Sequence, residues 1–264
     1  MSRTHLFAAV TAFALASGAQ AQTTTPAAPK APPAPATTSA VPAAPPAAMS
    51  ASMDDCTQTA DRAKAIAACG TIIKDAGKDT AKLAAAYAGR AAAAKGNGDL
   101  NAAFKDLSQA LYADPTNAGV WANRAAIRAA LGQHFRSAVD YSVALKYDPK
   151  NMAALLGRSD EYRRYGVLPK AIEDADAAIK LDPKSATAYA LRAYAHQREG
   201  HDDDAMKDAA QALTLDPNSA LAYAARGFAK VKTDKQGALD DLKKALSLDP
   251  KLEAVNDALK KMAN

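Results

Sequence analysis

The chain has 264 residues, of which 49% are hydrophobic, and a formal net charge of +5 at pH 7. Arg3 and Lys30 are the only charged residues before position 53, and without them 31 basic residues oppose 28 acidic ones. This near balance, with no basic stripe carrying interleaved aromatic residues, argues against a nucleic-acid-binding surface. After residue 21, no apolar run has the length that a membrane span requires.

The first 21 residues have the pattern of an export signal. A short polar start with Arg3 precedes an apolar run from Leu6 to Gly18, which is too short to cross a bilayer. Ala19-Gln20-Ala21 then offers a cleavage site of small residues. We therefore expect cleavage after Ala21 and a periplasmic or secreted protein. An uncleaved membrane anchor is the alternative interpretation.

Residues 22–52 are predicted to be a disordered linker. They contain eight of the fourteen prolines, with many Ala and Thr residues and Lys30 as the only charge. A segment of this composition has little to bury and favours extended conformations. We expect it to act as a semi-stiff tether in front of the folded part.

Residues 53–83 are predicted to form an N-terminal cap with one full helix, from Asp61 to Lys74. Both cysteines of the chain, Cys56 and Cys69, lie in this cap. In an exported protein this pair favours a disulfide, which would stabilise the cap by about 3 kcal/mol in the chain-entropy model. A metal site or a redox pair is the alternative, although the spacing is not CxxC and no histidine is near.

Residues 84–252 contain one pattern five times. The copies are 84–117, 118–151, 152–185, 186–219 and 220–252, and a proline near the end of each recurs at intervals of 34, 34, 34 and 33 residues. A period of 34 residues is typical of a helix–turn–helix unit. Small residues at positions 8, 20 and 27 of each copy let the two helices pack closely, and position 4, which is aromatic in every copy except the third, where it is Leu155, fills the space beside them.

Helix boundaries in the copies carry their own signals. A side-chain oxygen is expected to cap each of four first helices, at Asn117, Asn151, Ser185 and Ser219. Glycine is expected in the turn between the two helices, at Gly98, Gly132, Gly166 and Gly200. The fifth copy lacks one residue in this turn, around Lys232 to Gln236. Residues 253–264 follow as an amphipathic capping helix, with Val255, Ala258, Leu259 and Met262 on its apolar face.

The repeated pattern resembles the tetratricopeptide repeat family over roughly two-thirds of the chain. The resemblance implies an all-α solenoid of stacked helix–turn–helix repeats, wound as a right-handed superhelix behind the disordered N-terminal segment. It also implies a concave groove lined by the first helices. The family has a clamp for C-terminal carboxylates, but its Lys and Asn are missing from positions 5 and 9 here, so we reject that clamp.

One position departs from the family in every copy. Position 7 is Arg, where the family usually has Leu, and position 23 is Asp. We expect a ladder of structural ion pairs, within or between repeats, because a partly buried Arg needs an acidic partner. Two rows of solvated surface charge are the alternative. The residues are Arg90, Arg124, Arg158, Arg192 and Arg226, with Asp106, Asp140, Asp174, Asp208 and Asp241.

The groove positions that the resemblance implies are mostly alanine in the first two copies and larger in the last three. We expect the partner to bind at this C-terminal half, because Tyr and Arg often anchor interfaces. Packing between neighbouring first helices is the alternative role for Tyr194 and Phe228. The candidate groove residues are Leu156, Asp160, Arg163, Arg164, Tyr194, Gln197, Arg198, Leu221, Phe228 and Val231.

The sequence contains no catalytic or cofactor-binding motif. The run from His201 to Asp204 suggests a cation site, but it also coincides with a helix start, where acidic residues are favourable, and we prefer that interpretation. We therefore predict no enzymatic activity, no cofactor and no metal. The expected function is a scaffold or adaptor of the cell envelope that binds a peptide or helix of another protein. A holdase-like periplasmic chaperone is the alternative, and self-association through an exposed end of the stack also stays open.

Overall fold

A computed structural model describes residues 51–58 and 60–263, which form thirteen α-helices and no strand. The predicted export signal, and the predicted linker up to residue 50, lie outside the described residues. Within the described part of the chain, no helix has both the length and the apolar character needed to cross a membrane. The helices are α1 (Met53–Thr57), α2 (Arg62–Asp75), α3 (Thr80–Gly96), α4 (Leu100–Ala113), α5 (Ala118–Ala130), α6 (His134–Tyr147), α7 (Met152–Arg164), α8 (Leu168–Leu181), α9 (Ala186–Glu199), α10 (Asp202–Leu215), α11 (Ala220–Lys230), α12 (Lys235–Leu248) and α13 (Glu253–Ala263).

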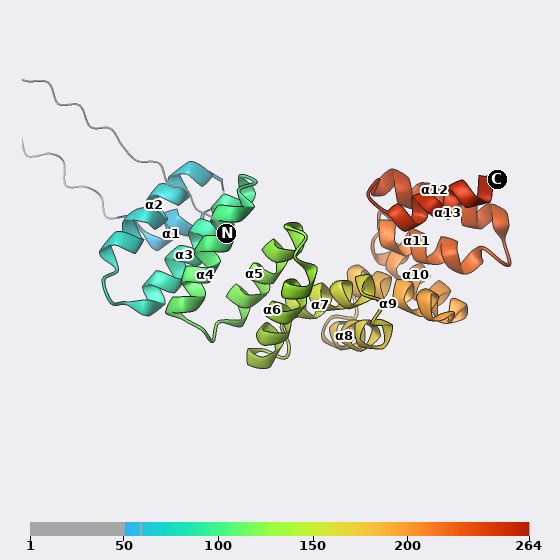
Figure 1. Ribbon diagram of the computed structural model, residues 1–264, viewed down its shortest axis with the longest axis horizontal. Coiled ribbons are helices and arrows are strands. Elements are labelled where there is room, and N and C mark those ends of the chain that lie inside the picture. The colour runs from blue at the N-terminus through green and yellow to red at the C-terminus, as the bar shows by residue number, and fades with distance from the viewer. Residues whose placement is uncertain (1–50, 59, 264) are drawn as a thin grey trace, which may run out of the picture. The chain divides into compact units, whose positions relative to one another are not determined.

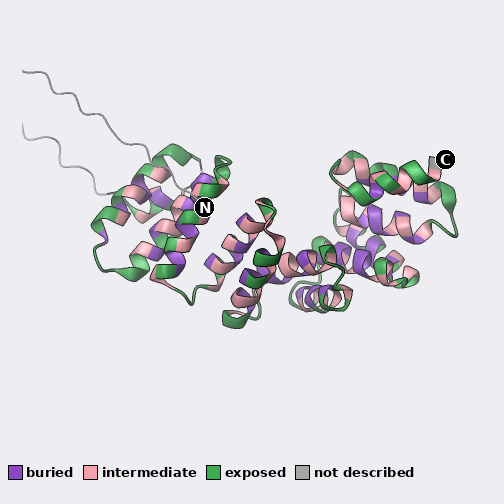
Figure 2. Cartoon of the chain, viewed as in Figure 1, coloured by how far each residue is buried: buried purple, intermediate pink, exposed green. Residues whose placement is uncertain are grey.

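Helices α3 to α12 form five successive hairpins, one for each predicted copy (Figure 1). Each hairpin packs against the next, because the second helix of one contacts the first helix of the following one. The first helices α7, α9 and α11 also contact one another in sequence. Buried residues lie on the faces where helices meet, and exposed residues gather at the turns (Figure 2). The predicted all-α solenoid of helix–turn–helix repeats is therefore confirmed.

Local sequence signals act where they were expected. The four predicted capping side chains accept hydrogen bonds from the backbone N–H groups of Val120, Ala154, Ala188 and Ala222. The four turn glycines have φ between +73° and +86°, a region that glycine enters without the steric cost of a Cβ. In the fifth hairpin, α11 ends at Lys230 and the Asp234 side chain caps α12, so the missing residue lies in the turn.

The first hairpin begins earlier than predicted. We expected the first copy to start at Ala84, but α3 starts at Thr80 and its N-cap is Asp79. The later first helices each start three residues after a proline, which prevents an earlier start. No proline precedes α3, so the helix extends back by about one turn to the nearest capping side chain. The predicted boundary at residue 83 thus falls inside a helix.

A disulfide between Cys56 and Cys69 joins the five-residue α1 to α2. Both cysteines are fully buried and pack against Ala86 of α3. Gly89 of α3 lies directly beneath them, where an added Cβ would be 2.9 Å from the Cys56 sulfur atom. A helix of five residues is not stable by itself, so the bond and this packing hold it in place.

The Arg and Asp rows pair within each hairpin. The Arg on the first helix donates two hydrogen bonds, from Nε and Nη2, to the two carboxylate oxygens of the Asp on the second helix, over 2.6–3.0 Å. All five Asp residues are buried, with at most 8% of their surface exposed. Each pair therefore connects the two helices of its own repeat by a bidentate, charge-assisted contact.

Three of these arginines also reach the preceding repeat. Nη1 of Arg124, Arg158 and Arg192 donates to Ser108, Ser142 and Asp176, respectively, over 3.5, 3.2 and 2.6 Å. These three acceptors share position 25 of the previous copy. Ala210 holds that position before Arg226 and offers no acceptor side chain. The ladder is thus linked both within and between repeats.

An aromatic ring lies beside each guanidinium group. The rings at position 4 are 4.6–5.5 Å from the Arg in four repeats, with Trp121 beside Arg124 the closest. In the third repeat, where position 4 is Leu155, Tyr162 takes this place at 5.6 Å from Arg158. The sequence suggested only a space-filling role for the position-4 aromatics, but the structure adds cation–π contacts to the ladder.

Removing one arginine of the ladder should destabilise the fold. Arg158→Ala leaves Asp174 buried without its charged partner, which should lower the free energy of unfolding by about 3 kcal/mol. Urea denaturation followed by circular dichroism measures this, with the exposed Arg136→Ala as control. The double variant Arg158→Leu/Asp174→Leu should lose less than the single one, and a single variant as stable as the control would contradict a structural role.

Gly157 of α7 is required by a close helix contact. A Cβ at this position would overlap the buried Tyr141 ring of α6, whereas a Cβ at Gly70 of α2 would meet only Arg90 Nη1 at 4.0 Å. Gly157→Ala should therefore destabilise the protein by about 1–2 kcal/mol, because overpacking outweighs the gain in helix propensity. Gly70→Ala should stabilise it by up to about 1 kcal/mol. Equal melting temperatures for the two variants would refute this account.

Candidate functional site

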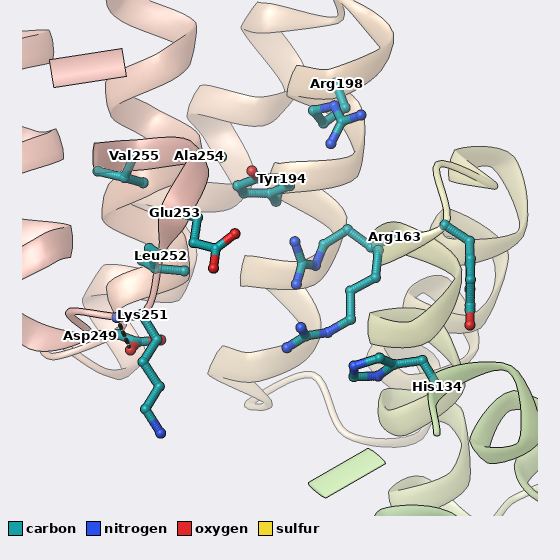
Figure 3. Close-up of a pocket in the computed structure, with 12 residues that line it drawn as sticks. His134, Arg163, Tyr194, Arg198, Asp249, Lys251, Leu252, Glu253, Ala254 and Val255 are labelled. Carbon is teal, nitrogen blue, oxygen red and sulfur yellow. Dashed lines mark hydrogen bonds between the residues drawn. The ribbon is translucent and has the colours of Figure 1, made fainter. Parts of the chain in front are cut away.

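A hollow of about 630 Å³ opens between α6, α7, α9 and the start of α13, and we call it the arginine hollow (Figure 3). Arginines from α7 and α9 line it, opposite the residues that lead into α13. Leu252 and Glu253 stand across the hollow from Arg163 and His134 in Figure 3. The lining residues are His134, Arg163, Arg164, Tyr165, Tyr194, Arg198, Asp249, Lys251, Leu252, Glu253, Ala254 and Val255.

Asp160 positions two of the arginines. Nε and Nη2 of Arg163 donate to its Oδ1 over 2.9 and 2.6 Å, and Nε of Arg164 donates to its Oδ2 over 2.8 Å. Burial would raise the pKa of Asp160, but the charges of Arg163 and Arg164 outweigh it and hold the pKa below its usual value. The carboxylate therefore stays ionised at neutral pH and fixes both guanidinium groups at the edge of the hollow.

His134 continues the polar lining from α6. Its Nδ1 is 3.0 Å from Oε2 of Glu161, a carboxyl group that is buried on α7. Burial raises the pKa of Glu161, and the neighbouring His134 opposes the rise. The contact ties the start of α6 to α7, so that His134 faces the hollow from a fixed position.

Tyr194 forms the wall between α9 and α13. It is only 4% exposed, and its ring lies 4.8 Å from the Arg163 guanidinium group. Tyr194 also packs edge-to-face on Phe228 of α11, with 6.2 Å between ring centroids, and both belong to a core cluster with Val255 of α13. Packing between neighbouring first helices, the alternative considered above, is therefore what the structure shows for these two rings.

The structure divides the predicted groove residues. Arg163, Arg164, Tyr194 and Arg198 line the arginine hollow. Asp160 does not line it but accepts hydrogen bonds from Arg163 and Arg164. A second hollow, of about 420 Å³, is lined by Tyr194, Gln197, Arg198 and Phe228 together with four residues of α13. Leu156 and Leu221 pack against core clusters instead, and Val231 lies at the end of α11, at the start of the turn.

Sequence reasoning missed the part of α13 in this site. The helix was correctly predicted to be amphipathic, and its face of Val255, Ala258, Leu259 and Met262 packs on the core. The first residues of α13, Glu253 to Val255, together with Asp249, Lys251 and Leu252 before the helix, close one side of the arginine hollow. His134 was also missed, because its neighbour in space, Glu161, is 27 residues away in sequence.

A third hollow, of about 640 Å³, is mainly apolar and lies on α6 and the turn after α7; we call it the apolar hollow. Phe135, which lines it, is 70% exposed, and Val139, Tyr165 and Val167 are also exposed. Exposed apolar clusters of this kind often mark contact sites. The predicted groove lies on the first helices, whereas this hollow lies mainly on α6, a second helix. The complete lining is Phe135, Ala138, Val139, Ser142, Val143, Lys146, Tyr162, Tyr165 and Val167.

Known proteins share this architecture of repeated helical hairpins. A family model described as "Tetratricopeptide repeat" matches residues 186–219, the fourth copy. No curated protein matches the chain. The solved structure of YrrB, described as a TPR protein with an unusual peptide-binding site, has a similar fold, with 19% identity, a TM-score of 0.57, and coverage of 73% of this chain and 97% of that one. The solved structure of residues 41 to the end of MamA from Desulfovibrio magneticus RS-1 is also similar, with 19% identity, a TM-score of 0.55, and coverage of 64% of this chain and 97% of that one. A thermophilic TPR protein of Thermus thermophilus is a further example (19%, 0.51, 66% and 95%).

The repeated hairpins and the hollows between them define a helical repeat protein of the solenoid class. Within this class, residues 186–219 match the tetratricopeptide repeat family model, and the fold of the whole repeat region is similar to those of solved TPR proteins. The segment that the family model matches has the aromatic residue, the small residues and the turn glycine, as do the first two copies. The other copies keep the same period and the same hairpin, with the Arg–Asp pair in each.

Tyr194 should behave as a core residue in mutagenesis. Because it is buried against Phe228, Arg163 and α13, Tyr194→Ala should lower the free energy of unfolding by about 3 kcal/mol. Tyr112→Ala is the matched control, because Tyr112 is 89% exposed, and it should leave the melting curve unchanged. If both variants melt like the parent, the packing of Tyr194 described above is wrong.

Proposed function

We propose that this protein is a non-enzymatic scaffold that binds a segment of another protein in the arginine hollow. The observation that carries the proposal is the convergence of guanidinium groups from two repeats on a hollow large enough for several side chains of a peptide. Arginine presents a planar fork of donors that matches carboxylate groups. The favoured ligand is therefore a segment with Asp or Glu side chains.

The charges around the hollow support an acidic ligand. Four cationic side chains, those of Arg163, Arg164, Arg198 and Lys251, line the hollow with two carboxylates, those of Asp249 and Glu253, and Arg163 and Arg164 share Asp160 as their ion-pair partner within 4.0 Å. Arg198 is exposed at the rim, and among the described residues no carboxylate lies within 4.0 Å of its guanidinium group. The structure of YrrB, which has a similar fold, is described as having a peptide-binding site, and this supports a peptide as the ligand.

We also propose an adaptor role in the cell envelope. The support is the export-signal pattern of residues 1–21, with cleavage after Ala21, and the disulfide between the only two cysteines. The proline-rich residues 22–52 would then separate the hairpins from whatever holds the N-terminal end.

A second candidate function is a holdase that binds exported chains through apolar segments. The apolar hollow favours it, because Phe135 and its neighbours expose an unusual amount of apolar surface. The two functions depend on different hollows, so they can be separated by substitutions.

Selection of peptides on the purified full chain tests the proposal. Twelve-residue random peptides displayed on phage should be enriched in Asp and Glu, and the selected peptide should bind more weakly as ionic strength rises. Arg198→Glu should weaken its binding about tenfold or more, since it places like charge against the ligand. The control Lys207→Glu makes the same charge change at a side chain that is 76% exposed on α10, and it should have little effect.

The opposite pattern would reject the acidic ligand. Enrichment of apolar peptides whose binding is unaffected by Arg198→Glu but is lost in Phe135→Ala contradicts the arginine hollow as the binding site. Suppression of aggregation of an unrelated unfolded protein, with the same dependence on Phe135, would then favour the holdase. Circular dichroism of each variant shows whether its fold is intact.

A further inference from the structure

We propose that His196, Glu199 and His201 form a binding site for a divalent transition-metal ion of the zinc type, independent of the arginine hollow. The three residues lie at the end of α9 and at the turn into α10, in the fourth repeat. One potential ligand atom from each lies within 4.8 Å of the others. Two imidazole nitrogens and one carboxylate oxygen are a common protein ligand set for zinc, with water in the fourth position.

The backbone at Gly200 brings the three side chains together. Gly200 ends α9 with φ of +86°, and this left-handed turn reverses the chain between Glu199 and His201. His201 then lies back against the end of the helix, with its Nδ1 3.5 Å from Oε2 of Glu199 and its ring centroid 5.8 Å from that of His196. Ligand atoms around zinc at bond lengths of about 2.1 Å are roughly 3.4 Å apart, so the Glu199–His201 separation already fits.

Outside their own cluster, the structure gives His196 and His201 no side-chain hydrogen bond among the described residues. Among the described residues, Nδ1 of His196 is buried without a hydrogen-bond partner, which is an unfavourable state for a ring nitrogen. His201 occupies the N-cap of α10 but makes no side-chain capping bond. A bound metal would satisfy a nitrogen on each ring. The separations of up to 4.8 Å exceed the zinc ligand spacing by at most about 1.4 Å, and the His201 side chain, which is 58% exposed, can move by this amount.

The other repeats show that the fold itself does not require these residues. Positions 11, 14 and 16 of the copies hold different side chains, and only the fourth copy combines two histidines with a carboxylate. The run from His201 to Asp204, which first suggested a cation, contributes His201 alone to the cluster, because its partners come from α9. The corresponding residues are Ala94, Asn97 and Asp99 in the first copy, Arg128, Leu131 and Gln133 in the second, and Tyr162, Tyr165 and Val167 in the third.

Zinc titration of the untagged full chain by calorimetry tests the site. We expect one saturable site per chain, and with Co²⁺ as a probe we expect the visible absorption of a low-coordinate complex. His196→Ala and His201→Ala should each weaken zinc binding at least about tenfold, since even the loss of a residue that only supports a ligand has this effect. Glu199→Gln, which keeps the size of the side chain, should also weaken it.

His134→Ala is the matched control, because His134 lies beside a carboxyl group in another repeat and should not affect zinc binding. Zinc should also shift the nuclear magnetic resonance signals of the His196 and His201 rings but not that of His134. Absence of saturable zinc binding by the parent protein overturns the proposal, as does equal binding by a folded His196→Ala/His201→Ala variant. Neither result bears on peptide binding at Arg198.

Discussion

Each hairpin of this protein is closed by a bidentate ion pair between an arginine on the first helix and a buried aspartate on the second. A leucine at the arginine position would close the same hairpin by apolar contact alone. The ion pair adds direction, because the guanidinium fork donates to the carboxylate in one orientation and leaves a further donor for the preceding repeat. The ion pair thereby fixes the register between the two helices. Their other contacts are mostly between alanine side chains, which are too small to fix the register.

Much of this arrangement was predictable from the sequence. The period of 34 residues indicated the hairpins, and Arg at position 7 with Asp at position 23 indicated the pairs, because local spacing within one repeat determines both. Whether an arginine also reaches the preceding repeat could not be decided, since that depends on the distance between hairpins. The contact between Arg192 and Asp176 joins residues whose spacing, 16 positions, is also the spacing of the pair within a repeat.

The candidate sites were less predictable, because they depend on how elements meet at the ends of the helices. Helix α13 was recognised as amphipathic, but the periodicity of a helix does not say which neighbours its polar side will face. Figure 3 shows the consequence, with Glu253 facing Arg163 across the arginine hollow. Similarly, His196 and His201 are five residues apart, and only the left-handed turn at Gly200 makes them neighbours.

The ladder and the variable hollows are connected through the geometry of the hairpin. Positions 7 and 23 lie between the helices and keep the same residues in every copy, so the backbone follows the same course each time. Positions 14 and 16 lie near the turn, and among the described residues none of their side chains forms an ion pair with the buried Asp. Position 11 lies closer to the pair, because Arg128 and Lys230 there also contact Asp140 and Asp241, over 2.7 and 3.0 Å. Side chains near the turns can therefore differ between copies, with the apolar hollow at the second and third copies and the histidine cluster at the fourth. A solenoid built in this way can acquire different binding chemistry in each repeat without a change in its packing.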